Sequence, residues 1–252
     1  EGQTAFITGA SSGIGEALAL AFAREGAAVA LAARRAEKLQ HVCRAITESG
    51  GRAQAFPCDV TDAASLQSAV ADTVQAFGAL HVAVANAGFG VNGAFTKLAT
   101  DDFRRQFETN EFGVLNTVYA VLPHLMEAKG RLGVVSSVMG RVGLPASTAY
   151  CASKFAVVGF AQALEAELVG TNVRIKTLCP PPGDTPMVRN LPEKPPIYKL
   201  ARLYTAEEIV DSWLGSLDRP SRLQLVDLQS KLMYRVDRVV PKVVDAFIRL
   251  AR

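Results

Sequence analysis

The chain has 252 residues, of which 49% are hydrophobic and 20% charged, an ordinary profile for a single globular domain. The net charge of +3 and the scattered basic residues argue against a nucleic-acid-binding protein. No apolar stretch reaches the length of about 18 residues that a transmembrane helix needs. The four cysteines lie far apart, without zinc or redox spacing, so we expect reduced thiols and a cytoplasmic location.

Short apolar segments alternate with longer segments of helical periodicity. The predicted strands are Thr4–Thr8, Ala28–Ala32, Arg52–Phe56, His81–Ala85, Leu132–Ser136 and Val173–Leu178. The predicted helices are Gly13–Arg24, Ala36–Ser49, Ala63–Phe77, Asp101–Ala128 and Ala149–Leu168. This alternation is typical of the α/β class, a doubly wound parallel sheet of about seven strands with helices on both faces, the Rossmann fold.

The remaining third of the chain carries weaker signals. Pro180–Pro196 is rich in proline and reads as a long loop, whereas Thr205–Glu208 has capping-box spacing and should start a helix. Arg222–Asp227 is the expected last strand. We therefore predict one domain over residues 1–252, with a substrate loop at 180–204 and an amphipathic helical tail at 229–252.

The sequence TGASSGIG follows the first predicted strand and opens a helix at Thr8–Gly15. Glycines let the chain turn sharply and let a diphosphate approach the backbone, while the helix N-terminus presents free N–H groups. A tight turn without a ligand is the simpler alternative, and the strand–turn–helix context favours a dinucleotide site. The spacing is GxxxGxG, which differs from the general GxGxxG fingerprint.

Arg34 and Arg35 follow the second predicted strand, about 20 residues past the glycines, where NAD-binding folds carry an acidic residue. A guanidinium there suits the 2′-phosphate of NADP(H), although arginines are also commonplace at a solvated helix start. Asp59 and Val60 follow the third strand. The Asp59 carboxylate is a candidate partner for an adenine amino group, or an ordinary turn residue.

Several motifs together resemble the short-chain dehydrogenase/reductase family, in its single-domain branch. They are TGASSGIG, the ANAG of Ala85–Gly88, Asn110 in TNEFG, Ser137, and the YCASK of Tyr150–Lys154. Ser137 precedes Tyr150 by 13 residues, which is the family's spacing. The resemblance runs from about Thr4 to Thr185, and five elements in this order are far more specific than a lone YxxxK.

The resemblance implies an NADP(H)-dependent oxidoreductase that interconverts a carbonyl and a secondary alcohol. The implied catalytic residues are Asn110, Ser137, Tyr150 and Lys154. The implied cofactor-binding residues are Gly9, Ser11, Ser12, Gly13, Ile14, Gly15, Arg34, Arg35, Asp59, Val60, Asn86, Ala87, Gly88, Tyr150, Lys154, Pro180, Gly183 and Thr185. No metal site is expected.

The catalytic set has a chemical rationale. A free phenol has a pKa of about 10, and an ammonium one helical turn away, such as that of Lys154, lowers it. Tyr150 would then give the proton that carbonyl reduction needs. By the resemblance, Lys154 also holds the nicotinamide ribose, Ser137 donates to the substrate oxygen, and Asn110 anchors a water for proton exchange. Each residue alone has an ordinary structural explanation.

Two departures from the family pattern stand out. Pro181 occupies the place of a glycine in CPPPGDTP, so the loop path there should differ, with Gly183 as the residue that meets the nicotinamide amide. The C-terminus lacks the Asp-Gly-Gly ending of tetrameric members, which leaves homodimer and homotetramer open. The two long helices, 101–128 and 149–168, are the expected dimer interface by resemblance. These departures motivate a second hypothesis, a non-catalytic NADP(H)-binding sensor or scaffold.

The expected substrate is apolar, because the residues expected around the pocket are mostly hydrophobic. They are Phe89, Val91, Phe95, Met187, Val188, Leu191, Ile197 and Leu200. The tail repeats apolar residues at helical spacing from Leu232 to Ile248, accompanied by five cations and by Asp237 and Asp245. Packing on its own domain or on a partner subunit is the favoured explanation, and attachment to a membrane surface is the alternative.

Overall fold

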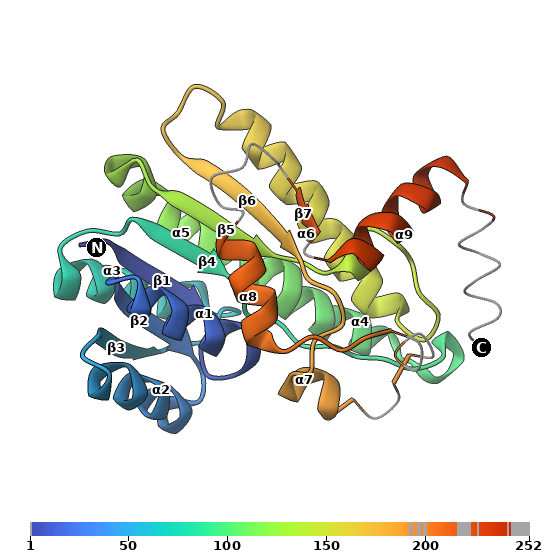
Figure 1. Ribbon diagram of the computed structural model, residues 1–252, viewed down its shortest axis with the longest axis horizontal. Coiled ribbons are helices and arrows are strands. Elements are labelled where there is room, and N and C mark those ends of the chain that lie inside the picture. Colours follow the sequence, from blue (N-terminus) through green and yellow to red (C-terminus); the bar gives the residue numbers. More distant parts are fainter. Residues whose placement is uncertain are drawn as a thin grey trace.

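The computed structural model describes residues 2–191, 194–195, 198, 201–215, 223–225, 227–240 and 242. Its strands are β1 (Thr4–Thr8), β2 (Ala28–Ala33), β3 (Arg52–Pro57), β4 (Val82–Ala85), β5 (Arg131–Val135), β6 (Arg174–Cys179) and the short β7 (Leu223–Leu225). All pair in parallel, in the order β3-β2-β1-β4-β5-β6-β7 (Figure 1). The chain order reverses between β1 and β4, and this switch point is where doubly wound sheets bind ligands.

Two hydrophobic layers hold the helices against the sheet. One face packs against α1 (Gly13–Arg24), α2 (Ala36–Glu48) and α8 (Ala206–Leu214). The other packs against α3 (Ala63–Phe77), α5 (Gly113–Ala128) and α6 (Thr148–Glu167). The central strands β1 and β4 are buried along their whole length, as their unbroken apolar sequences predict, because helices cover both faces.

The predicted fold class is confirmed, and most predicted boundaries shift by one or two residues. The largest correction concerns the single helix expected over Asp101–Ala128. It consists of α4 (Thr100–Phe107), a π-helical turn at Glu108–Phe112, and α5. Apolar periodicity does not reveal a π turn, because one extra residue per turn leaves the pattern on either side intact.

The C-terminal elements agree with the sequence in part. Thr205 and Glu208 form the predicted capping box and start α8. Pro180–Pro196 is less loop-like than expected, since Pro186–Arg189 forms the short helix α7. The tail forms α9 (Leu228–Val239), which ends just before Pro241, and residues 243–252 lie outside the described part. Among the described helices, none has the length and apolarity needed to cross a bilayer.

The cysteines agree with the expectation of reduced thiols. Cys43, Cys58, Cys151 and Cys179 are all free and buried. Burial raises the pKa of the Cys58 thiol to about 11 and that of Cys179 to about 12, so both are protonated at neutral pH. We therefore assign them to packing.

Candidate active site

The glycine turn between β1 and α1 has the conformation that only glycine accommodates easily. Gly9 and Gly13 have φ values of +67° and +60°. A Cβ on Gly9 would lie 2.9 Å from Ala87 Cα, and one on Gly15 would lie 2.3 Å from the Gly9 carbonyl oxygen. The turn is therefore packed against the segment after β4, and its open side faces the N-terminus of α1.

Thr8 and Asn86 join the two segments that meet at the switch point. The Thr8 hydroxyl accepts hydrogen bonds from the Asn86 and Ala87 N–H groups, at 3.0 and 3.1 Å. The Asn86 side-chain amide donates to the Thr8 carbonyl at 2.9 Å. Sequence reasoning assigned Asn86 to the cofactor and missed Thr8, whose position at the end of β1 was the available signal.

The two arginines after β2 point to different partners. Arg34 Nη1 lies 3.7 Å from Asp59 Oδ2, and the Arg34 side chain is 74% exposed. Arg35 Nη2 lies 2.9 Å from the hydroxyl oxygens of both Ser11 and Ser12. Two cations and two hydroxyls thus flank one opening, and this group is suited to a phosphate beside the diphosphate site.

Ser137, Tyr150 and Lys154 converge from two elements. Ser137 is the second residue after β5 and caps the 3₁₀ turn Val138–Gly140, where its hydroxyl accepts a hydrogen bond from the Met139 N–H at 3.1 Å. Tyr150 and Lys154 are one turn apart on α6, and the Lys154 ammonium lies 5.9 Å from the centre of the Tyr150 ring. Lys154 Nζ also donates to the Val135 carbonyl at 3.0 Å, which ties the start of α6 to the end of β5.

Burial dominates the electrostatics of this group. It raises the pKa of Tyr150 above its ordinary value, whereas the sequence predicted a value lowered by Lys154. The hydrogen bond with Ser137, and not the Lys154 charge, is the interaction that acts in the opposite direction. Burial also lowers the pKa of Lys154 to about 8, although the negative charge of the neighbouring Glu111 raises it in part. The lysine is therefore close to its titration point at neutral pH, and small changes in nearby charge alter its protonation.

Asn110 lies in the π turn and is fully buried. Its side-chain oxygen accepts the Phe89 N–H at 3.0 Å, and its amide donates to the Phe89 carbonyl at 3.0 Å and to Ser153 Oγ at 3.1 Å. The π turn thus clamps the segment after β4 to α6, next to Lys154. The role of water anchor, expected from the resemblance, stays a prediction.

Glu111, the next residue in the turn, was not singled out by the sequence. Within the described residues, its buried Oε2 has no hydrogen-bond partner. Burial raises the pKa of Glu111 to about 7, and the attraction of Lys154 lowers it in part. The half-buried Glu111 and the buried Lys154, which carry opposite charges when ionised, therefore lie close enough to influence each other.

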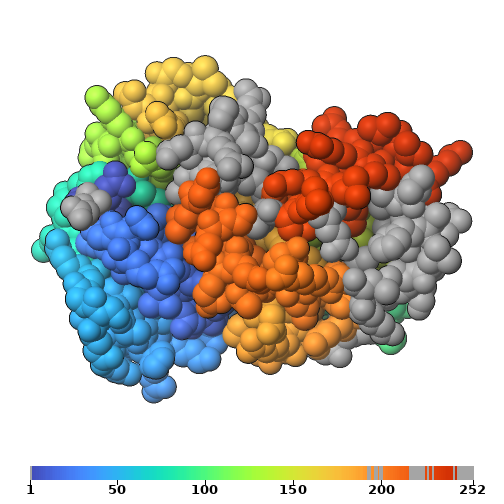
Figure 2. Space-filling model, viewed as in Figure 1, coloured from blue at the N-terminus to red at the C-terminus, as the bar shows by residue number. Residues whose placement is uncertain are grey.

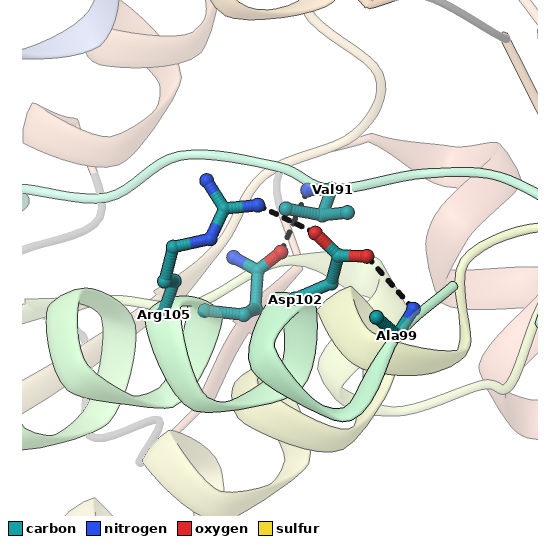
Figure 3. Close-up of polar contacts among 5 residues, drawn as sticks. Val91, Ala99, Asp102 and Arg105 are labelled. Carbon is teal, nitrogen blue, oxygen red and sulfur yellow. Dashed lines mark hydrogen bonds and ion pairs between the residues drawn. The ribbon is translucent and has the colours of Figure 1, made fainter.

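Helix α4 fixes the other end of the segment after β4. The Gln106 side chain accepts the Val91 N–H at 2.6 Å and also donates to the Phe89 carbonyl. At the start of α4, the Asp102 carboxylate accepts the Ala99 N–H at 2.9 Å and pairs with Arg105, which ties the residue before the helix to its first turn (Figure 3). The segment from Phe89 to Val91, of which Phe89 lines the cavity, is thus held by Gln106 of α4 and by Asn110 of the π turn.

One cavity of about 470 Å³ unites these parts. Of the catalytic and cofactor residues named from the sequence, all line it except Gly15, which packs inside the turn, and Asn110, which is buried beneath the wall. Its lining includes Phe89, Met187, Val188 and Leu191 as predicted, and also Tyr198, which the sequence analysis did not name. Val91 and Phe95 do not line the cavity, and Phe95 is 67% exposed. Ile197 and Leu200 lie outside the described residues.

The proline segment keeps its place beside the site. The Pro180 carbonyl accepts the Val138 N–H at 3.0 Å, and the Pro182 carbonyl accepts the Tyr204 N–H at 3.0 Å. Gly183 pairs with Tyr204 in an isolated parallel bridge, and Pro180, Pro181, Gly183 and Thr185 all line the cavity. Pro181 therefore fits into this wall, and the loop is anchored on both of its sides.

Comparison with known proteins agrees with this geometry. The family model for short chain dehydrogenases matches residues 3–196. The ketoacyl reductase HetN of Nostoc is 30% identical to the chain, over 98% of this chain and 88% of its own. A short chain dehydrogenase from Burkholderia cenocepacia in complex with NADP is 26% identical, with a TM-score of 0.84 over 98% of both chains.

A further solved structure extends the fold comparison. A short chain dehydrogenase/reductase from Burkholderia phymatum, in complex with NAD, has a TM-score of 0.87 at 23% identity. It covers 96% of this chain and 95% of its own. The structural relatives thus hold NAD or NADP, and the cavity here has the glycine turn and helix N-terminus that a nicotinamide dinucleotide requires. The chain belongs to the short-chain dehydrogenase/reductase family and is an oxidoreductase of that family.

Proposed function

We propose that the protein is an NADP(H)-dependent oxidoreductase that interconverts a carbonyl and a secondary alcohol on an apolar substrate. The observation that carries this proposal is the convergence of Ser137, Tyr150 and Lys154 with the glycine turn in one cavity. Side chains for proton transfer and a cradle for a diphosphate have little reason to share a cavity unless hydride and proton transfer occur together.

The preference for NADP(H) is supported by the end of β2. Arg34 and Arg35 stand there in place of the acidic residue that would bind the 2′-hydroxyl of NAD. Ser11 and Ser12, already bonded to Arg35, add hydroxyls that donate to a 2′-phosphate. A structural relative in this family binds NAD, so membership of the family does not by itself determine the cofactor. The proposed preference for NADP(H) therefore depends on Arg34, Arg35, Ser11 and Ser12.

The chemistry assigned to the side chains follows from their positions. When bound, the nicotinamide supplies or accepts a hydride. The Ser137 hydroxyl orients the substrate oxygen, and Tyr150, which hydrogen-bonds with Ser137, gives that oxygen a proton in reduction or takes it in oxidation. Lys154 stabilises the Tyr150 phenolate by its positive charge. Asn110 fixes the position of α6 relative to the segment after β4, through its hydrogen bonds to Ser153 and Phe89.

An apolar substrate is supported by the apolar side chains in the cavity lining. Phe89, Met187, Val188, Leu191 and Tyr198 line it, together with the uncharged polar residues Asn92 and Asn190. The Nostoc relative is named a ketoacyl reductase, so its substrate carries a carbonyl on an acyl group. We therefore place a carbonyl attached to a hydrocarbon chain or ring first among candidates.

A homodimer through α5 and α6 is also part of this proposal. The exposed aromatic and aliphatic side chains are Phe112 at the end of the π turn, Tyr119 and Met126 on α5, and Phe155 on α6. Isolated exposed apolar residues are normal, but four on these helical segments support an interaction surface. The alternative of a non-catalytic NADP(H)-binding sensor gains no specific support, since Pro181 fits the cavity wall.

The decisive experiment follows NADPH absorbance over a panel of aliphatic, cyclic and aromatic carbonyls. We expect turnover with at least one apolar member, and a loss of 100-fold or more in Tyr150→Phe, since general acid–base catalysis contributes roughly 10²–10⁴-fold. Tyr204→Phe is the matched control, because this phenol lies outside the cavity lining. NADPH binding with no turnover across the panel would support the sensor hypothesis instead.

A further inference from the structure

Helix α9 packs on the active-site side of the domain through one face. Met233 and Val236 contact a buried cluster formed around Val138 and Met139, which Tyr150 and Tyr198 also join. The Arg141 guanidinium lies 4.4 Å from the centre of the Tyr234 ring and donates a hydrogen bond to the Tyr234 hydroxyl. The tail's expected packing on its own domain is therefore confirmed for this face.

The opposite face of α9 is apolar and uncovered. Leu228, Leu232 and Val239 are 81%, 59% and 79% exposed, and at 100° per residue they fall within about 40° of one another. Val240, just past the helix, is 47% exposed. We call these four residues the α9 stripe. The helix lies at the end of the molecule farthest from α2 and β3, where its surface projects outward (Figures 1 and 2).

Charge on α9 is distributed unevenly about the stripe. Lys231, Arg235 and Arg238 are exposed and fall on one flank, within about 60° of one another. Asp237 lies on the side turned toward the domain, about 160° from the stripe, and is only partly exposed. Within the described residues, no carboxylate pairs with these three cations. Asp237 therefore does not face the same surface as the stripe and does not oppose an anionic partner there.

We infer that the stripe and its basic flank dock on an anionic lipid surface. Arg238 donates a hydrogen bond to the Tyr234 hydroxyl at 3.1 Å, so Lys231 and Arg235 are the main candidates for headgroup contacts. Aliphatic side chains beside exposed lysine and arginine match the acyl boundary and the phosphate headgroups of such a surface. A second copy of this chain fits less well, because it would bring the same cations to the interface.

Docking through α9 would place the active site close to the lipid. The inner face of the helix contacts the cluster beside Tyr150 and Tyr198, so α9 would lie between the lipid surface and the substrate cavity. An apolar carbonyl dissolved in lipid would then have a short path to the cavity. This consequence depends on the proposed function, whereas the docking itself does not.

The test uses the full chain and vesicles of phosphatidylcholine, alone or mixed with phosphatidylglycerol, in a co-sedimentation assay without substrate or cofactor. We expect binding to the anionic vesicles only, weakened by added salt. Leu232→Glu with Val239→Glu should abolish it. Lys231→Gln with Arg235→Gln should weaken it by up to roughly 30-fold, at about 1 kcal/mol per cation. Leu203→Glu, an exposed leucine before α8, is the matched control and should bind as the wild type does.

Two results would overturn the inference. One is equal binding to both kinds of vesicle, or none. The other is full binding by the stripe variant, provided that its thermal unfolding matches the wild type. Sedimentation velocity without lipid tests the alternative of self-association. If the wild type does not bind vesicles and the stripe variant changes its oligomeric state, the stripe is an interface between copies of this chain. Activity of the loaded enzyme, measured separately with a water-soluble carbonyl, distinguishes failure of this inference from failure of the proposed function.

Discussion

Arg35 reaches from the start of α2 back to the glycine turn, where its Nη2 lies 2.9 Å from Ser12 Oγ and equally close to Ser11 Oγ. This contact joins the two segments that the sequence separately assigned to diphosphate and ribose. Arg34, one residue earlier, turns instead toward Asp59. Arg35 is thus the arginine already directed at the site, and we expect it to contribute more to cofactor choice than Arg34.

Arg35→Ala should raise the KM for NADPH by roughly 10- to 100-fold, because hydrogen bonds to charged groups contribute about 1.5–3 kcal/mol. The KM for NADH should change little, since NADH lacks the 2′-phosphate. Arg34→Ala should have the same direction and a smaller effect. Arg44→Ala, an exposed arginine farther along α2, is the control. Equal increases in the KM for NADPH and the KM for NADH would show that Arg35 stabilises the glycine turn and does not bind the 2′-phosphate.

Glu111→Gln should move the alkaline limb of the activity profile to lower pH. The pKa of Lys154 is about 8 and is held up in part by Glu111, so loss of the carboxylate lowers it further. The ammonium, and with it the support for the Tyr150 phenolate, is then lost at lower pH. Glu108→Gln, an exposed glutamate in the same π turn, should leave the profile unchanged. An unmoved limb in Glu111→Gln would mean that this carboxyl does not act on Lys154.

The same carboxyl should also affect stability. Its pKa is raised from 4.5 to about 7 in the folded chain, so the folded state binds the proton more tightly than the unfolded state does. The free energy of unfolding should therefore fall as pH rises from 4.5 to about 7. In Glu111→Gln this fall should be smaller, and urea unfolding at several pH values measures it. Identical pH dependence in the two proteins would contradict the raised pKa.

Gly133→Ala should destabilise the fold. Gly133 lies in β5, and an added Cβ would meet Trp213 Cη2 at 2.7 Å and Cζ2 at 3.0 Å, in the rigid ring of a side chain that is 1% exposed. Overpacking of this kind costs about 1–3 kcal/mol. Gly143→Ala is the control, because no other heavy atom lies within 4 Å of its added Cβ. Thermal unfolding should separate the two variants, and an unchanged Tm in Gly133→Ala would show that the indole can shift.

The sequence predicted the parts of this molecule that depend on local pattern. Apolar strands, the glycine turn and the YxxxK pair all follow from spacing along the chain, and their positions are close to those predicted. Features that depend on contacts across the chain were missed. Thr8, Gln106 and Ser153 gain their importance only from partners on other segments. The π turn and the inward side of Asp237 likewise depend on how a helix is wound and which face it buries.

Charge on the face formed by α5 and α6 should disrupt the proposed dimer. Tyr119 is 76% exposed on α5 and Phe155 is 45% exposed on α6, and an interface would bury both. Tyr119→Asp and Phe155→Asp would each place an unpaired carboxylate there, which costs several kcal/mol when no partner charge is present. Sedimentation velocity should show a wild-type dimer, monomers for both variants, and a dimer for the control Leu203→Asp. A monomeric wild type, or dimers that persist in both variants, would place the interface elsewhere.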